Sequence, residues 1–216
     1  MKIPPWTFTN LRDAENCLRQ YHHKHVLRDV PFEETAATRW GNSVHSAMET
    51  RLKTGSPLAD GFASYETFVP AKTNALRGLI EFKMGMKADG THCDFFDKEV
   101  WGRGKLDFAL VNHEAHTAAI VDWKTGKTRE DPDELEIFAL LLRAKYPALQ
   151  KIAGWYVWLK EMKMGKVYDL SDTNGKLANV KHRLERIALA ASTDSWEPRQ
   201  GPLCGWCGVK TCEFRP

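Results

Sequence analysis

Apolar residues recur along the chain at two spacings, every three or four positions in some segments and in short unbroken runs in others. The three-to-four spacing predicts helices over residues 7–27, 33–53, most of 61–89 and 176–192. Another helix is predicted to start at Asp131-Pro132-Asp133-Glu134 and to end near Lys145. There Asp is the expected cap, Pro takes the first helical position, and Glu134 completes a capping box.

Short apolar runs predict the strands. Residues 106–111 and 118–121 flank the polar stretch 112–117 and form a predicted β-hairpin. Residues 152–159 are apolar and aromatic, as expected of a buried strand, and 166–170 form a possible neighbouring strand. Asn174-Gly175 is expected to be a turn. The fold class that follows is α/β, with a central mixed β-sheet flanked by helices on both faces.

Composition narrows the class of protein. The 216 residues are 43% hydrophobic and 27% charged, which suits one globular domain over residues 1–216. The formal net charge of +3 is compatible with nucleic-acid binding and too small to prove it. The sequence has no apolar run near the ~20 residues that span a membrane and no signal-peptide core. We therefore expect a cytoplasmic protein without a membrane partner, in which the five cysteines stay reduced.

The hairpin carries the candidate chemistry. Asp107 lies within its first strand, and Asp122 closes the second. A carboxylate buried in each of two neighbouring strands is costly unless it has a partner, and a divalent metal is the natural partner for two such oxygens. Lys124 lies two residues beyond Asp122, so both side chains lie on one face of the strand. A partly solvated Asp–Lys pair is the simpler structural alternative.

These residues also resemble a known family. Gly104-Lys105-Leu106-Asp107, followed by Asp122-Trp123-Lys124-Thr125-Gly126, resembles the RecB-like branch of the PD-(D/E)XK nuclease superfamily. The resemblance implies the restriction-endonuclease-like arrangement of that fold, with a catalytic hairpin in the central sheet. It also implies a Mg²⁺- or Mn²⁺-dependent deoxyribonuclease in which Asp107, Asp122 and Lys124 are catalytic.

The resemblance extends to the metal ligands. They would be the side chains of His45, Asp107 and Asp122 and the main-chain carbonyl of Trp123.

His45 enters this set because the resembled branch has Gly-x-x-x-His-x-x-x-Glu on a helix, and Gly41, His45 and Glu49 have that spacing. Glu49 would contact the metal ligands without binding the metal itself. Without the resemblance, His45 and Glu49 could equally be an intrahelical pair.

Two further groups of residues are candidates for contacts with DNA. The resembled branch carries Gln-x-x-x-Tyr on the helix after the hairpin, where this chain has Glu134 and Phe138, so the role of both positions is open. The basic residues near the hairpin could hold the DNA backbone, which chiefly determines position and affinity. They are Arg103, Lys105, Lys127 and Arg129.

The C-terminal segment, residues 196–216, contains three cysteines spaced Cys204-x2-Cys207-x4-Cys212. Such short loops bring thiolates onto a metal, and a fourth ligand would be Cys17 or Cys93. RecB-like nucleases with a 4Fe-4S cluster have a lone cysteine on the first helix, which implies Cys17 as the fourth ligand. Structural Zn²⁺ is the main alternative, and disulfides rank third.

The resemblance implies a stand-alone exonuclease that hydrolyses phosphodiester bonds at DNA ends or in single strands. It is similar to phage nucleases of recombination or genome processing, which act in the host cytoplasm, and to CRISPR-adaptation nucleases. Recombination or CRISPR-adaptation proteins are thus possible partners besides DNA. Two alternatives stay open: a non-cleaving DNA-binding or assembly subunit with a degenerate site, and a restriction-type endonuclease.

Overall fold

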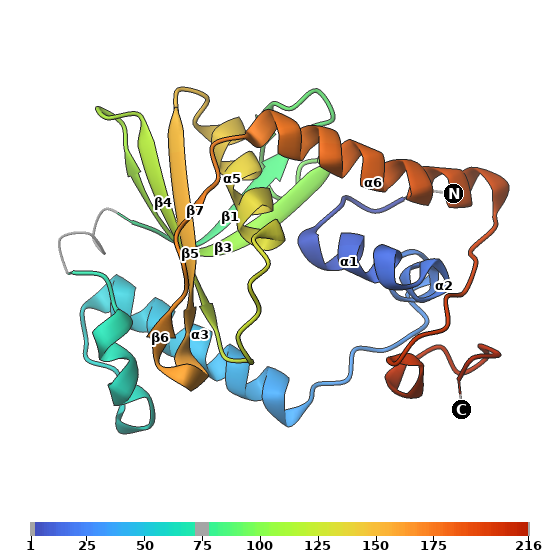
Figure 1. Cartoon of the computed structure of the whole chain (residues 1–216), viewed down its shortest axis with the longest axis horizontal. Coiled ribbons are helices and arrows are strands. Elements are labelled where there is room, and N and C mark those ends of the chain that lie inside the picture. Colours follow the sequence, from blue (N-terminus) through green and yellow to red (C-terminus); the bar gives the residue numbers. More distant parts are fainter. Residues whose placement is uncertain (1–2, 72–77, 216) are drawn as a thin grey trace.

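The computed structural model describes residues 3–71 and 78–215 and has a mixed β-sheet at its centre (Figure 1). The strand order is β2-β1-β3-β4-β5-β6, with β7 also paired to β5. Among the described strands, β4 and β5 pair in parallel and the other pairs are antiparallel. The strands are β1 (Leu79–Met86), β2 (His92–Cys93), β3 (Gly102–Asn112), β4 (Thr117–Lys124), β5 (Lys151–Trp158), β6 (Lys163–Met164) and β7 (Tyr168–Asp169).

Helices cover both faces of the sheet, which confirms the expected α/β class. One core packs α1, α5 and α6 against the sheet, and a second core packs α3 against the other face. In Figure 1, α3 crosses below the sheet, while α6 and α1 lie together at the right. The α-helices are α1 (Phe8–Asn16), α2 (Leu18–Tyr21), α3 (Ala36–Thr54), α5 (Asp133–Lys145) and α6 (Thr173–Thr193).

The β3–β4 hairpin and the following crossover form the framework of the sheet. As predicted, β3 and β4 are antiparallel, with Phe108 opposite Val121. The chain then passes through α5 to β5, which lies parallel to β4, so both strands are enclosed and apolar. Gly104 lets α5 approach β3 closely, because a Cβ there would lie 2.8 Å from Leu141 Cδ1. The close contact between Gly104 and Leu141 holds α5 against the hairpin.

The predicted N-terminal helix is interrupted at Cys17. Thr7 caps α1 by accepting from the Asn10 N–H at 3.1 Å, as expected, but Cys17 is extended, with φ −165° and ψ 119°. The chain then continues as α2 and a π-helix, His22–Leu27. The break turns the Cys17 thiol out of the helical pattern and toward the C-terminal segment.

The helix predicted over residues 61–89 is wrong for most of its length. Residues 60–68 form a 3₁₀-helix, Asp60–Phe68, and residues 79–86 are strand β1. Residue Leu76 of that prediction lies outside the described residues. The apolar positions were correctly assigned to the core, with Met84 fully buried, but pairing with β3 decides their backbone. Tertiary pairing outweighs a helical pattern that is this short.

Two helix starts differ from the expectation. Asn174-Gly175 is the first turn of α6, because the Asp172 side chain accepts from the Gly175 N–H at 2.9 Å and caps the helix. Helix α5 is assigned from Asp133 on, and the Asp131 side chain accepts from the Asp133 N–H at 3.1 Å, as expected of a cap. Glu134 does not complete a capping box with it. The Glu134 side chain is instead committed to Lys124.

Candidate active site

Along β1 and β3, side chains alternate between the two faces of the sheet, and this alternation shifts by one residue at Glu81 and Asp107. Phe82 packs into the α5 core and Ile80 into the α3 core, which places the shift at Glu81. Glu81 has φ 48°, a left-handed conformation that non-glycine residues rarely adopt and that is often found at functional sites. The β1–β3 register puts it opposite Asp107, between the pairs Ile80–Phe108 and Phe82–Leu106.

His45 of α3 meets both carboxylates. Its Nδ1 lies 3.2 Å from Asp107 Oδ1 and 3.8 Å from Glu81 Oε1. One ligand atom from each of the three residues lies within 4.8 Å of the other two. An imidazole with two carboxylates is a donor set that suits a divalent cation. Sequence reasoning found His45 and Asp107 but missed Glu81, because residues 79–86 were predicted as helix.

Without a bound cation, the two carboxylates favour the protonated, positively charged form of the His45 imidazole. Hydrogen bonds to Asp107 and then Glu81 raise the pKa of His45 to about 10, against the opposing effect of burial. Burial by itself would raise the pKa of Glu81, but His45 and Lys105 outweigh it and lower that pKa. Lys105, a predicted DNA contact, forms an ion pair with Glu81. The site therefore brings together the negative charges of Asp107 and Glu81, which His45 and Lys105 balance.

Asp107 occupies the point where β3 and β4 diverge. Backbone pairing between these strands ends at Phe108–Val121. The next inward amide, Trp123 N–H, donates to Asp107 Oδ2 at 2.9 Å. Extending the register puts Asp122 opposite Asp107, just beyond the last pair. The hairpin therefore presents both predicted carboxylates at the same level.

Asp122 and Lys124 lie on one face of β4, as period two predicts. Lys124 Nζ is 2.7 Å from Asp122 Oδ2 and 2.6 Å from Glu134 Oε2. Lys124 is the one partner of this buried oxygen among the described residues, and the contact is an ion pair. Such an oxygen fits a bound cation.

Burial and charge act against each other in this pair. Burial raises the pKa of Asp122 well above its ordinary value, although Lys124 opposes the shift. Burial by itself would lower the pKa of Lys124, but the carboxylates of Asp122 and Glu134 outweigh it and raise that pKa. Lys124 also lies 5.4 Å from the ring of Tyr156, a cation–π distance. Lys124 is therefore held as a positively charged group at the site.

The other residues suggested by the motifs fall into different environments. Glu49 pairs with Lys53 one turn along α3, at 2.5 Å. Phe138 is buried in the α5 core, so it packs against the sheet and does not face a ligand. Lys127 is exposed, and Arg129 NH2 lies 3.6 Å from Asp131.

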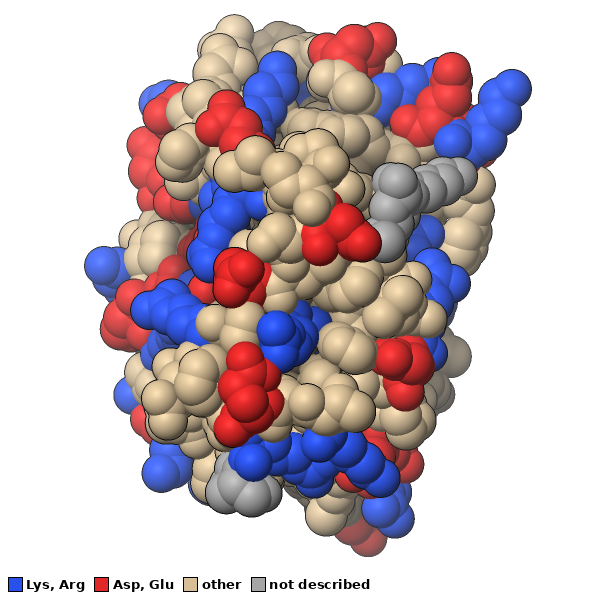
Figure 2. Space-filling model, turned by 90° about the vertical axis from the view of Figure 1, so that its right-hand side faces the viewer, with Lys and Arg blue, Asp and Glu red and all other residues tan. Residues whose placement is uncertain are grey.

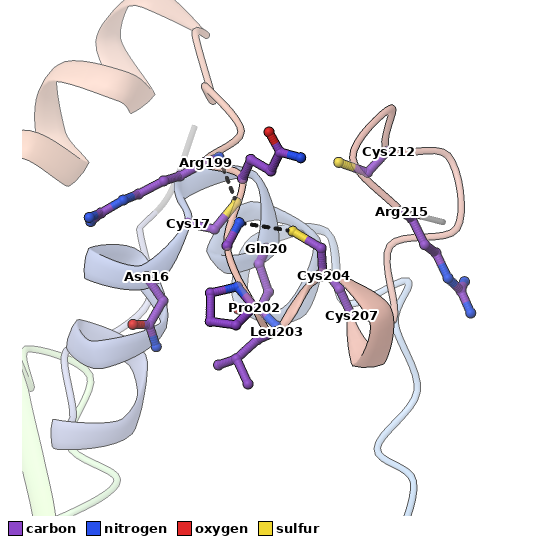
Figure 3. Close-up of a pocket in the computed structure, with 12 residues that line it drawn as sticks. Asn16, Cys17, Gln20, Arg199, Pro202, Leu203, Cys204, Cys207, Cys212 and Arg215 are labelled. Carbon is purple, nitrogen blue, oxygen red and sulfur yellow. Dashed lines mark hydrogen bonds between the residues drawn. The ribbon is translucent and has the colours of Figure 1, made fainter.

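Four of the five cysteines line one cavity between α1, α2 and the C-terminal segment (Figure 3). Cys17, Cys204, Cys207 and Cys212 surround a volume of about 260 Å³. Cys93 lies elsewhere, buried in β2. Within the described residues, the group His45, Glu81 and Asp107 alone meets the 4.8 Å criterion, so no three of these sulfurs are that close together.

Main-chain amides point at two of these sulfurs. Arg199 N–H donates to Cys17 Sγ at 3.4 Å, and Gly201 N–H donates to Cys204 Sγ at 3.3 Å. Both contacts are drawn in Figure 3. Amide donors stabilise thiolates and the sulfurs of iron–sulfur clusters. The cavity is lined by residues from both ends of the described chain, and whether it holds the expected metal group stays a prediction.

One face of the molecule shows how charge is distributed on its surface. On the face drawn in Figure 2, Lys and Arg are interspersed with Asp and Glu and form no single basic field. No helix among the described residues is long and apolar enough to cross a membrane.

Comparisons with known proteins identify the family. The model of the PD-(D/E)XK nuclease superfamily matches residues 5–212. Among solved structures, the fold is similar to a protein from Eubacterium rectale named as a proposed exonuclease, at TM-score 0.61 and 15% identity. That match covers 98% of this chain and 90% of that one. The fold is also similar to the protein SSO0001, at TM-score 0.54 and 13% identity, over 100% of this chain and 89% of the other. No curated protein matches the sequence.

At these identities the solved structures establish only the fold, whereas the family model covers nearly all of the described chain. The chain therefore belongs to the PD-(D/E)XK nuclease superfamily, whose members are metal-dependent phosphodiester hydrolases that act on DNA.

Proposed function

We propose that this protein is a Mg²⁺- or Mn²⁺-dependent DNA exonuclease. The observation that carries the proposal is the meeting of His45, Glu81 and Asp107 beside the buried Asp122–Lys124 pair. The similar fold of a protein named as a proposed exonuclease, and the motifs of nucleases that process DNA ends, support action at ends or in single strands. Recombination or CRISPR-adaptation proteins are the partners that the motifs favour.

The metal ligands in this proposal are His45, Glu81, Asp107 and Asp122, with the main-chain carbonyl of Trp123. The fit rests on the two carboxylates around His45 and on the buried carboxylate of Asp122 beside them. A divalent cation bound there supplies charge to the scissile phosphate and lowers the pKa of bound water.

Lys124 acts beside that cation. Its charged ammonium would orient the attacking water and offset negative charge on the phosphate. Glu134 positions Lys124 by accepting its hydrogen bond at 2.6 Å. This contact supports a role for Glu134 beside Lys124 and weighs against a degenerate, non-cleaving site.

We further propose that Cys17, Cys204, Cys207 and Cys212 bind a 4Fe-4S cluster. A single zinc ion would need its sulfurs ~2.3 Å from one centre and therefore close together. The thiolates of a cluster attach to different irons and are spread more widely. The described sulfurs do not form a compact ligand group, so the proposal of a cluster rests on the shared cavity and on the cysteine motif.

An assay on end-labelled DNA tests the function. Purified protein should degrade linear single- or double-stranded DNA progressively with Mn²⁺ and should leave covalently closed circles intact. Asp122→Asn should reduce cleavage at least ~100-fold, because the site loses a ligand charge. Undiminished cleavage by Asp122→Asn would overturn the assignment of this site. Cleavage of closed circles would make the enzyme an endonuclease.

A further inference from the structure

Two phenylalanines lie in the segment that joins β2 to β3. Phe95 is half-buried, while Phe96 is 75% exposed, and their ring centroids are 4.9 Å apart in an edge-on arrangement. The backbone already holds this segment: Asp97 N–H donates to Asp94 O at 3.0 Å and Trp101 N–H to Met86 O at 2.9 Å. Anchoring the segment therefore does not require the exposed ring of Phe96.

Two cations flank the same rings. Lys83 Nζ lies 5.7 Å from the Phe95 centroid and 5.5 Å from the Phe96 centroid. The guanidinium carbon of Arg103 lies 4.9 Å from Phe95 and 5.9 Å from Phe96. Neither cation forms an ion pair with a carboxylate within the described ranges. Their charge is thus available to an anion beside an aromatic surface.

This group lies on the same strand face as the candidate active site. Period two along β3 places Arg103 and Lys105 on the same face as Asp107. Lys83 on β1 lies opposite Lys105 in the β1–β3 pair and so belongs to that face as well. Four residues at about 3.3 Å each separate Arg103 from Asp107 by about 13 Å along the strand. At the 3.4 Å rise of stacked DNA this distance corresponds to about four nucleotides.

Aromatic rings beside cations are the chemistry that holds single-stranded nucleic acid. Bases stack on the rings, and the cations take the phosphates, without selecting a sequence. A blunt duplex keeps its bases stacked on one another, so an exposed ring can gain little from it. The arrangement therefore favours an unpaired strand over a duplex.

We propose that Phe96, with Phe95, Lys83 and Arg103, forms a single-strand platform that binds the unpaired segment of the DNA substrate. The bound strand runs along β3 past Lys105 toward Asp107. This inference rests on the proposed nuclease function and narrows its substrate class to single-stranded DNA and duplexes with single-stranded tails.

Binding by fluorescence anisotropy tests the platform, using the full chain carrying Asp122→Asn so that DNA stays intact. Adding Phe96→Ala should weaken binding of a labelled oligo-dT about tenfold and leave a blunt hairpin duplex unaffected. Phe32→Ala removes another highly exposed ring and is the matched control, which should bind as the parent does. Phe96→Trp should preserve the affinity.

Salt dependence separates charge from stacking. Lys83→Ala with Arg103→Ala should lower the slope of log affinity against log salt by about 1.4, at about 0.7 per cation for single strands. Lys181→Ala, an exposed lysine on α6, should leave the slope unchanged.

Unchanged oligo-dT affinity in Phe96→Ala would overturn the platform while leaving the nuclease intact. Absence of metal-dependent cleavage by the wild-type protein would overturn the nuclease proposal, even where Phe96→Ala binds more weakly.

Discussion

The main-chain N–H of Trp123 donates a 2.9 Å hydrogen bond to Oδ2 of Asp107, where backbone pairing between β3 and β4 has just ended. The same carboxylate turns Oδ1 toward His45, at 3.2 Å. One oxygen of Asp107 thus accepts the hydrogen bond that a backbone carbonyl of β3 would otherwise accept from Trp123 N–H. The other oxygen faces the candidate active site. A residue used in both ways is fixed in orientation before any cation binds.

These two uses of Asp107 can be separated by substitution. Asp107→Asn keeps a carbonyl oxygen for Trp123 N–H, so the protein should stay near wild-type stability while losing at least ~100-fold in cleavage. Asp107→Ala leaves that amide unpaired and should cost an additional ~1–3 kcal/mol of unfolding free energy. Urea denaturation and end-label assays measure both. Equal stability of the two variants would contradict the bridging role.

Glu81 combines strain with function. Glu81→Gly accepts φ 48° without penalty, which offsets the loss of the ion pairs with Lys105 and His45. The free energy of unfolding should therefore change by less than about 1 kcal/mol, while the Mn²⁺ needed for cleavage increases. Lys83→Gly is the control, because it lies in the same strand outside the left-handed region and should be destabilised. An unchanged Mn²⁺ titration for Glu81→Gly would remove Glu81 from the proposed ligand set.

Asp122 links stability to the metal. Its charge is buried and raises the energy of the metal-free protein, so Asp122→Asn should melt at or above the wild-type temperature in EDTA. Mn²⁺ should raise the melting temperature of the wild type, by about 2–4 °C per kcal/mol of binding, and should raise that of Asp122→Asn much less. Calorimetric scans with and without Mn²⁺ measure this. Equal Mn²⁺ shifts for both proteins would exclude Asp122 as a ligand.

Asp133 stabilises the packing of α5 on α6 through the nearly buried cations Lys176 and Arg183. Asp133→Ala should cost about 3 kcal/mol of unfolding free energy at pH 7, because both cations lose a partner.

The pH dependence follows from the sign of the shift. Burial by itself would raise the pKa of Asp133, but Lys176 and Arg183 outweigh it and lower that pKa. The carboxylate therefore stabilises the fold fully above the ordinary Asp value of ~3.9, and this contribution is lost as pH falls through the folded pKa. The difference between wild type and Asp133→Ala should shrink in acid, and a constant difference would rule out the ionised pair as its source.

The cysteine cavity predicts a coloured protein. Anaerobically purified protein should be brown, and Cys17→Ser should lose the visible absorbance and unfold more easily, because the proposed cluster would join the two ends of the chain. Cys93→Ser should retain the colour, since Cys93 lies in β2 away from the cavity. Zinc without iron in a metal analysis would change the identity of the bound metal but keep its ligands. Full iron content in Cys17→Ser would overturn the ligand set.

The sequence by itself determined the hairpin and the Asp122–Lys124 pair on its second strand. Alternation along β4 is local, so Asp122 and Lys124 must share a face once the strand forms. The apolar run of β5 and the apolar spacing of α6 are likewise local and were predicted closely. The position of His45 came from a motif on one helix, which also depends only on spacing along that helix.

Tertiary structure decided the residues whose role depends on contacts between distant segments. Glu81 joins the site only because β1 pairs with β3 and its backbone turns left-handed there, and neither property follows from the few residues around it. Glu134 reaches Lys124 because the crossover through α5 brings the start of that helix beside the end of β4. The free energy of both arrangements comes from long-range pairing and packing, which local periodicity does not encode.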